Sequence, residues 1–174
     1  MKTNIEILAE RARRLAVNAN DTDDQSGKTY NVVEFLLTPE RYSIDCQYIK
    51  EVLLLKELTP IPGAPAFVAG LTNVRGKIIS IVDLKIFLGL VTKGITDLNK
   101  TIILSYEGME FGIITDAILG TKIIRETSIS AAPDTLQGKG ATYVRGITPD
   151  GMIMLDGERL LSEKSLIVNQ KQKI

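Results

Sequence analysis

Histidine and tryptophan are absent from the 174-residue sequence, and cysteine occurs once, at Cys46. Without histidine the chain lacks the commonest general base, the commonest metal ligand and any phosphohistidine relay. A single cysteine excludes an internal disulfide, and Cys46 is predicted to be a small core residue rather than a reactive thiol. Aromatic residues make up only 5% of the chain, which is little for stacking on nucleic-acid bases. These deficits favour a protein that is not an enzyme and binds no metal or cofactor.

An excess of either charge is also missing, because 21 Lys and Arg residues balance 21 Asp and Glu residues. The chain therefore has no large field that would steer it onto nucleic acid or an anionic membrane surface. No apolar run reaches the roughly 18 residues of a membrane span, and no signal-peptide hydrophobic region follows Met1. We expect a cytoplasmic protein that binds no nucleic acid and does not insert into a membrane.

Residues 1–28 are predicted to form an N-terminal amphipathic helix and a polar linker. Over residues 1–18 the small and apolar side chains fall on one stripe, formed by Ile5, Leu8, Ala9, Ala12, Leu15 and Ala16. Thr3 and Glu6 have the spacing of a capping box. A helix this short is marginal alone in water, so it must dock on its own chain or on a partner.

From residue 29 the sequence changes to short apolar runs separated by turns, which is typical of β-strands. We expect one β domain over residues 29–165 and a tail over 166–174. The segment from Tyr48 to Val52 is predicted as a helical turn, and the segment from Leu53 to Thr59 as a strand. Strands with turns every eight to twelve residues suggest small closed barrels, which have no exposed sheet edges.

The second half of this domain repeats the first. The pattern from Glu110 to Leu119 matches that from Arg41 to Ile49, and the pattern from Gly146 to Leu161 matches that from Gly70 to Leu88. We interpret this as an internal duplication in which each copy supplies about five short strands. The fold class is therefore all-β, with two five-stranded barrels over about residues 30–90 and 100–160, plus short connecting helices.

The stretch from Pro60 to Leu90 carries the clearest local signals. Prolines between Pro60 and Pro65 exclude a helix or a central strand there. The runs Gly70 to Val74 and Lys77 to Val82 flank Arg75-Gly76, which predicts a tight hairpin with Arg75 near its tip. Asp83 is placed to cap a short helix that follows.

No motif for phosphate binding or catalysis is convincing. Gly27-Lys28-Thr29 has the end of a P-loop motif, but position 22 is Thr rather than Gly and no strand precedes it. The carboxylates at strand ends, such as Asp83 and Asp156, are predicted to cap helices or turns. What remains is a surface or a groove that binds a partner.

One string of residues is specific enough to compare with known families: Pro62-x-x-Pro65-x-Phe67-Val68-x-Gly70-Leu71-x-Asn73-Val74-Arg75-Gly76-x-Ile78-x-x-Ile81-Val82-Asp83-Leu84. This string resembles the CheW family of bacterial chemotaxis coupling proteins. Further similarity covers about residues 30–165. Lys77 and Ser80 depart from the pattern, since the family often has an apolar residue and a proline there. The resemblance implies two SH3-like barrels around a shared core.

The resemblance further implies an adaptor that joins the cytoplasmic helical hairpin of chemoreceptors to the regulatory domain of the chemotaxis histidine kinase. A groove between the barrels would accept a receptor helix, and the kinase would bind mainly on the second barrel. Residues carried over by motif as partner-binding are Ile49, Lys50, Glu51, Gly70, Asn73 and Arg75.

Three alternatives remain open from the sequence. A double barrel could bind a small apolar ligand in its seam, which would require an internal cavity. An RNA-binding barrel would require a basic stripe and exposed aromatic residues, which the sequence lacks. An adaptor could also serve a chemosensory pathway whose output is not swimming.

Overall fold

The computed structural model describes residues 27–166 except residues 56, 93, 97 and 133–137. The predicted helix over residues 1–18, most of its linker and most of the predicted tail lie outside the described residues. The described strands are β1 Thr29–Leu37, β2 Glu40–Asp45, β3 Ile49–Leu54, β4 Val68–Val74, β5 Lys77–Val82, β6 Lys100–Tyr106, β7 Met109–Thr115, β8 Ala117–Arg125, β9 Val144–Ile147 and β10 Ile153–Leu155. The helices among these residues are short: η1 Cys46–Tyr48, α2 Leu84–Leu88, η2 Glu126–Ser128, α3 Lys139–Thr142, α4 Gly157–Leu161 and η3 Lys164–Leu166.

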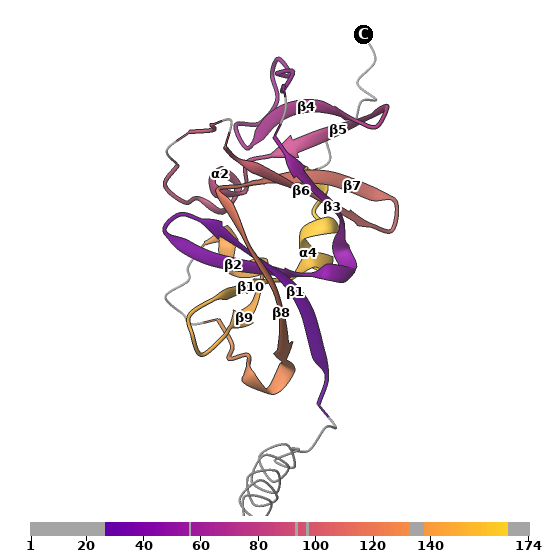
Figure 1. Cartoon of the computed structure of the whole chain (residues 1–174). Coiled ribbons are helices and arrows are strands. Elements are labelled where there is room, and N and C mark those ends of the chain that lie inside the picture. Colours follow the sequence, from indigo (N-terminus) through magenta and orange to yellow (C-terminus); the bar gives the residue numbers. More distant parts are fainter. Residues whose placement is uncertain (1–26, 56, 93, 97, 133–137, 167–174) are drawn as a thin grey trace, which may run out of the picture.

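The strands form two five-stranded sheets, which confirms the predicted all-β fold class with two barrels. One sheet has the order β8-β1-β2-β10-β9, and the other has the order β3-β6-β7-β5-β4. We call the first the terminal barrel and the second, which is continuous in sequence, the central barrel. They lie one above the other in Figure 1, with α2 and α4 at the level between them.

The two barrels have the same strand arrangement, as expected from the duplication. Each barrel contains two antiparallel hairpins, β1–β2 and β9–β10 in the terminal barrel and β6–β7 and β4–β5 in the central barrel. One parallel pairing joins the two hairpins of each barrel, β2 with β10 and β5 with β7. Strands β1–β5 and β6–β10 are the two copies. Each barrel, however, combines strands of both copies: β1 and β2 pair with β8–β10, and β6 and β7 pair with β3–β5.

The predicted barrel boundaries, about 30–90 and 100–160, are therefore wrong. The repeat pattern determines which residues form strands, but it does not determine which copy a hairpin pairs with. The parallel pairings join strands far apart in sequence and need long connections, which the remaining strands of each copy supply. Neither half of the chain can complete a barrel alone.

Local signals in the Pro60–Leu90 stretch are confirmed. β4 and β5 form the predicted hairpin, and both turn residues have positive φ, 53° at Arg75 and 84° at Gly76. The Asp83 carboxylate accepts hydrogen bonds from the backbone N–H groups of Lys85 and Ile86, so it caps α2 as expected. Asp156 caps α4 in the same way.

The segment before this hairpin differs from the prediction. The helical turn is η1 and ends at Tyr48, and residues 49–54 form strand β3 rather than a turn. Beyond β3, Thr59 makes only an isolated bridge to Leu71. Burial alternates from residue to residue over 49–54, and the apolar residues from Val52 onward suit a pleated strand better than a turn.

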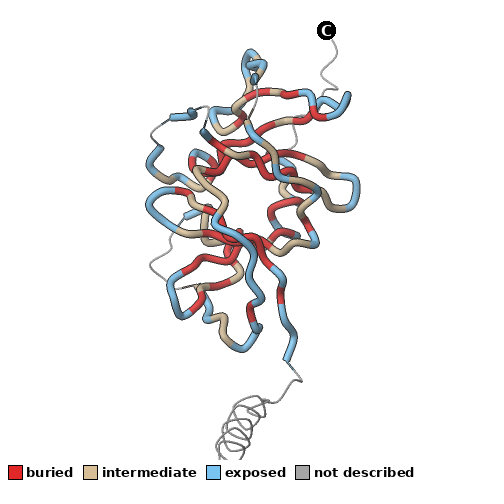
Figure 2. Tube along the Cα trace, in the orientation of Figure 1, coloured by how far each residue is buried: buried red, intermediate tan, exposed pale blue. Residues whose placement is uncertain are grey.

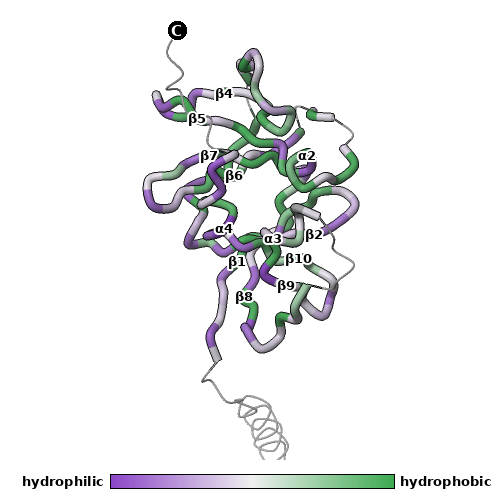
Figure 3. Tube along the Cα trace, turned by 180° about the vertical axis from the view of Figure 1, so that it is seen from behind, coloured by the Kyte–Doolittle hydropathy of each residue, from purple (hydrophilic) through white to green (hydrophobic). Residues whose placement is uncertain are grey.

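Buried side chains form one large core between the barrels and a small core inside each. The shared core draws on both sheets and includes Phe35, Ile44, Ile102, Phe111 and Leu160. In Figure 2 the buried segments gather around the junction of the barrels, and Figure 3 shows hydrophobic segments there. The interior of the terminal barrel is filled by Tyr30, Val32, Ile124, Met152 and Met154, and that of the central barrel by Val74, Ile79, Ile81, Ile103 and Ile114. Each fully buried side chain of this kind contributes about 1.5–3 kcal/mol, so the shared core holds the barrels together as one unit.

Asp116 ties the barrels together where the chain crosses between them. It is the single residue between β7 of the central barrel and β8 of the terminal barrel. One carboxylate oxygen accepts hydrogen bonds from Lys85 Nζ at 2.6 Å and from the Thr38 backbone N–H at 2.7 Å. The other accepts from Asn99 Nδ2 at 3.2 Å. Burial raises the pKa of Asp116, but the bonds from Lys85 and Thr38 outweigh it and hold the pKa below its usual value.

We expect Asp116→Asn to lower the free energy of unfolding by about 1–3 kcal/mol near neutral pH, because it leaves the mostly buried Lys85 ammonium without its counter-ion. A lowered carboxyl pKa stabilises the fold above the unfolded-state pKa of about 4, and this contribution is lost as pH falls through the folded-state value. The difference between parent and variant should therefore shrink on acidification, as measured by urea unfolding at several pH values. A difference that is constant with pH would contradict this role of the charge.

Candidate partner-binding site

An apolar groove runs between β3 of the central barrel and β8 of the terminal barrel. Its volume is about 460 Å³, and it is lined by Val33, Val52, Leu53, Leu54, Lys100, Ile118, Gly120 and Thr121. We call it the inter-barrel groove. β3 and β8 are both edge strands of their sheets, so the groove lies where each sheet ends. A partner that fills it would also cover these two edges.

The apolar character of the groove comes largely from β3. A half-buried strand normally alternates apolar and polar residues, but β3 continues with apolar residues on both faces. As a result Val52 is 42% exposed and Leu54 is 54% exposed. On the facing strand, Leu119 and Ile123 are also exposed, but neither lines the groove. Val52 and Leu54 are exposed apolar side chains in the groove lining, which indicates a binding surface rather than a core.

Charged side chains gather at the end of the central barrel, around the start of β3. Glu110 on β7 is bound by Lys50 Nζ at 3.0 Å and by Lys77 Nζ at 2.5 Å. The hydrogen bond from Lys77, together with that from Lys50, holds the pKa of Glu110 below its usual value despite its burial. Arg75, with an 84% exposed side chain, forms an ion pair of 3.1 Å with Glu51. The cationic ends of this cluster therefore face solvent.

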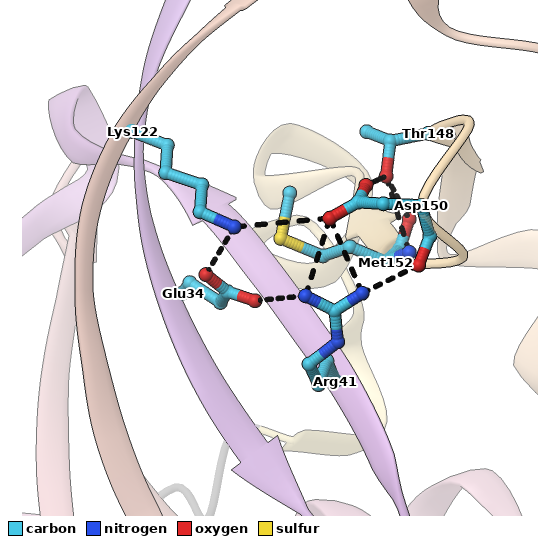
Figure 4. Close-up of polar contacts among 6 residues, drawn as sticks. All are labelled: Glu34, Arg41, Lys122, Thr148, Asp150 and Met152. Atoms are coloured by element: carbon cyan, nitrogen blue, oxygen red, sulfur yellow. Dashed lines mark hydrogen bonds and ion pairs between the residues drawn. The ribbon is translucent and has the colours of Figure 1, made fainter.

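The terminal barrel carries a different charge network near its β9–β10 turn, the counterpart of the β4–β5 turn that carries Arg75 (Figure 4). The Glu34 carboxylate, which is 5% exposed, is bound by Arg41 at 2.8 Å and by Lys122 at 2.7 Å. Arg41 also contacts Asp150 at 3.2 Å, and Thr148 holds Asp150 with a hydrogen bond that lowers its pKa. This network joins β1, β2, β8 and the β9–β10 turn. Its charged side chains are at most 53% exposed, whereas Arg75 is 84% exposed, which makes the central barrel the better candidate for a charged contact with a partner.

The described residues hold no group of three or more His, Cys, Asp or Glu side chains placed to bind a metal ion. Among the described helices none is long and apolar enough to cross a bilayer. The groove and the charge cluster are features of the described residues that favour partner binding.

Comparison with known proteins identifies the family. The sequence pattern of the CheW-like domain matches residues 31–165. The chain belongs to the CheW-like family. Chemotaxis protein CheW of Treponema pallidum (strain Nichols) is 32% identical over 161 residues, which cover 88% of this chain and 91% of that protein. Chemotaxis protein CheW of Bacillus subtilis (strain 168) is 28% identical over 106 residues, or 61% of this chain and 68% of that protein.

A solved structure gives the same result for the fold. The crystal structure of scaffolding protein TtCheW from Thermoanaerobacter tengcongensis aligns with a TM-score of 0.66 and 32% sequence identity. The alignment covers 74% of this chain and 89% of that one. The resemblance found in the sequence is confirmed, and the CheW-like chain is a chemotaxis adaptor.

The six residues carried over from the family lie on two strands of the central barrel and on the turn that follows one of them. Ile49, Lys50 and Glu51 begin β3, while Gly70 and Asn73 lie on β4 and Arg75 on the turn after it. The ion pair brings Glu51 and Arg75 together, but Lys50 points instead to Glu110. Their roles in binding stay predictions.

Asn73 and Gly70 have clear roles within their own chain. Asn73 Oδ1 accepts a hydrogen bond of 2.7 Å from the Gly76 backbone N–H, so it shapes the turn that presents Arg75. Gly70 is buried and has a φ of 150°, and a Cβ there would lie 2.7 Å from the carbonyl oxygen of Thr59. Gly70 therefore allows the hairpin to lie close to the segment after β3, whereas Asn73 acts within the hairpin.

We expect Gly70→Ala to lower the free energy of unfolding by about 1–3 kcal/mol, since alanine requires both an unfavourable φ and a shift of the Thr59 backbone. Thermal unfolding of the full chain is the measurement. Gly76→Ala is a useful comparison, because a Cβ at Gly76 meets nothing within 4 Å and only its φ of 84° is unfavourable. Equal losses for the two variants would contradict the close approach to Thr59 as the cause.

Sequence reasoning missed the lining of the inter-barrel groove and two members of the charge cluster, Lys77 and Glu110. The signal for the groove was present in β3, where Val52 and Leu54 break the alternation expected of a half-buried strand. No sequence signal placed Glu110 beside Lys50 and Lys77. These residues meet only because β7 pairs with β5 on one side and with β6, the neighbour of β3, on the other.

Proposed function

We propose that this adaptor works in the cytoplasm without a catalytic step, binding a chemoreceptor helix in the inter-barrel groove and the regulatory domain of a chemotaxis histidine kinase elsewhere. The observation that carries the proposal is the groove itself, with the half-exposed Val52 and Leu54 along one wall. The cytoplasmic tip of a chemoreceptor is a helical hairpin, whose apolar face could occupy such a groove.

The chemistry of the groove suits an amphipathic helix. Binding would bury the apolar wall formed by Val52 and Leu54 against the apolar stripe of the helix. Lys100 and Thr121 at the lining and Glu51 and Arg75 nearby supply polar groups that can fix the register of a bound helix. Interfaces with an apolar centre and a polar rim are typical of specific contacts.

The small-ligand alternative has less support. Such a ligand would need an internal cavity, but five hydrophobic side chains fill each barrel interior and the shared core occupies the space between the barrels. A second hollow, of about 490 Å³, lies between the β6–β7 turn and the C-terminal helices, and its lining includes Glu107, Glu110 and Lys164. Apolar side chains such as Met109 and Leu166 also line this hollow, but the charged groups among them do not favour a small apolar ligand.

Titration of the full chain tests the proposed function. The two titrants are a helical-hairpin fragment from a chemoreceptor tip and the regulatory domain of a chemotaxis kinase, both from the same genome. We expect saturable one-to-one binding of each with dissociation constants on the order of micromolar, equivalent to about −8 kcal/mol. The two partners should bind together, because they occupy different surfaces. Binding of neither partner would refute the proposal, and mutual exclusion would refute the use of separate surfaces.

A further inference from the structure

We propose that the N-terminal segment, residues 1–18, is an internal ligand of the inter-barrel groove and competes with the chemoreceptor helix. This regulation rests on the proposed function, because it assigns a competitor to the same site. The segment lies outside the described residues, so its contribution is argued from its sequence and from its attachment point.

The groove needs an amphipathic helix, and the chain contains the pattern of one. Its stripe of Ile5, Leu8, Ala9, Ala12, Leu15 and Ala16 has the spacing of one helical face. Small alanine side chains on this stripe allow a helix to approach a groove closely, while the larger Leu8 and Leu15 lie two turns apart. The pattern is that of a helix that docks on an apolar surface, and such a helix is marginal until it does so.

The described surface offers an apolar site close to where this segment is attached. Val52, Leu54 and Leu119 expose between two-fifths and three-fifths of their surface along or beside the groove, and Ile123 exposes 73%. β8, which carries Leu119 and Ile123, is the strand that pairs with β1 at the start of the described chain. Docking of the segment would cover apolar surface that is otherwise exposed to water.

The tether between the segment and the barrel has a suitable length. Ten residues lie between Asn18 and Thr29, where β1 begins. A flexible chain of that length has a root-mean-square span of about 17 Å and a maximum reach of about 35 Å. Val33, which lines the groove, lies about 13 Å along β1 from Thr29. The mean span of the tether thus matches the distance to the groove, the condition under which an attached ligand reaches its highest effective concentration.

Attachment makes even a weak contact effective. A tether of this kind gives an effective concentration on the order of 1 mM, so a helix with an intrinsic dissociation constant on the order of 0.1 mM would occupy the groove most of the time. A receptor helix must displace it, and its apparent affinity falls by about tenfold. The adaptor would then respond preferentially to receptor tips presented at high local concentration, as in a cluster of receptors.

The test compares two substitutions in the full chain. Leu8→Glu places a charge on the apolar stripe, whereas Ile7→Glu places the same charge on the opposite face of the predicted helix. The first readout is the NMR methyl signals of Val52 and Leu54. We expect Leu8→Glu to shift these signals, Ile7→Glu to leave them unchanged, and a synthetic peptide of residues 1–18 to restore the original shifts when added to the Leu8→Glu chain.

The second readout is the affinity for the chemoreceptor tip fragment. We expect Leu8→Glu to raise this affinity by about tenfold and Ile7→Glu to leave it within twofold of the parent chain. Methyl signals that respond equally to both substitutions, or to neither, would overturn the internal docking. Methyl signals that respond as expected, together with no binding of the receptor fragment by any chain, would refute the proposed receptor site and leave the internal docking supported. A shifted signal without a gain in affinity would overturn the competition.

Discussion

Replacing Val52 and Leu54 together by glutamate is expected to weaken binding of the chemoreceptor tip fragment by about 100-fold or more. Each substitution removes an apolar contact and requires a carboxylate to lose its hydration in the groove, and effects of about 1–3 kcal/mol for each position are usual at the centre of an interface. The fold should persist, because both side chains are about half exposed in the free chain. Calorimetric titration with the receptor fragment is the measurement.

The chain offers a matched control for this prediction. Ile78 on β5 is 50% exposed, similar to Leu54, but it does not line the groove. Ile78→Glu should therefore leave receptor binding within a factor of about two. Binding of the kinase regulatory domain should be preserved in the groove variant, which shows that the protein is folded. A groove variant that retains receptor affinity, or a control that loses as much, would place the receptor site elsewhere.

Arg75→Glu is expected to abolish coupling between receptor and kinase while leaving the fold intact. The side chain is 84% exposed, and its ion pair with Glu51 is a surface contact of the kind that contributes little to stability. The substitution reverses the charge at the tip of the β4–β5 hairpin and places two carboxylates side by side. We expect at least about a tenfold loss in receptor affinity, since like charges across an interface cost several kcal/mol. Formation of the receptor–adaptor–kinase complex on a sizing column is the measurement.

A double variant that exchanges the two charges, Glu51→Arg with Arg75→Glu, separates two roles of Arg75: contact with a partner and the ion pair with Glu51. It restores the ion pair but keeps the reversed charge at the hairpin tip. We expect unfolding to be indistinguishable from that of the parent chain and binding to stay lost, because Arg75 acts on a partner directly. Arg159→Glu is a control away from the hairpin, since Arg159 is also largely exposed, at 63%, and pairs with a carboxylate, that of Asp156 at the start of α4, at 3.6 Å. Recovery of binding in the double variant would instead show that the ion pair acts only by orienting β3 and the hairpin.

The binding site combines features that the sequence could and could not predict. The motif from Pro62 to Leu84 predicted the hairpin that presents Arg75 and the cap at Asp83, because turns and caps depend on a few neighbouring residues and their allowed backbone angles. It did not predict that Gly70 faces the Thr59 carbonyl or that Glu110 lies between Lys50 and Lys77. Those contacts join segments that are distant in sequence, and no local pattern encodes them.

The sequence alone determined that the chain is an all-β protein built from two copies of a five-stranded pattern, since alternation, turn residues and repetition are local properties. It also determined the family, through the string around Asn73-Val74-Arg75-Gly76. Only the tertiary structure decided that β1 and β2 pair with β8–β10, and thereby that β3 and β8 border one groove. Two similar copies offer each hairpin nearly the same local partners, so the choice between them depends on long connections and on the core that both barrels share.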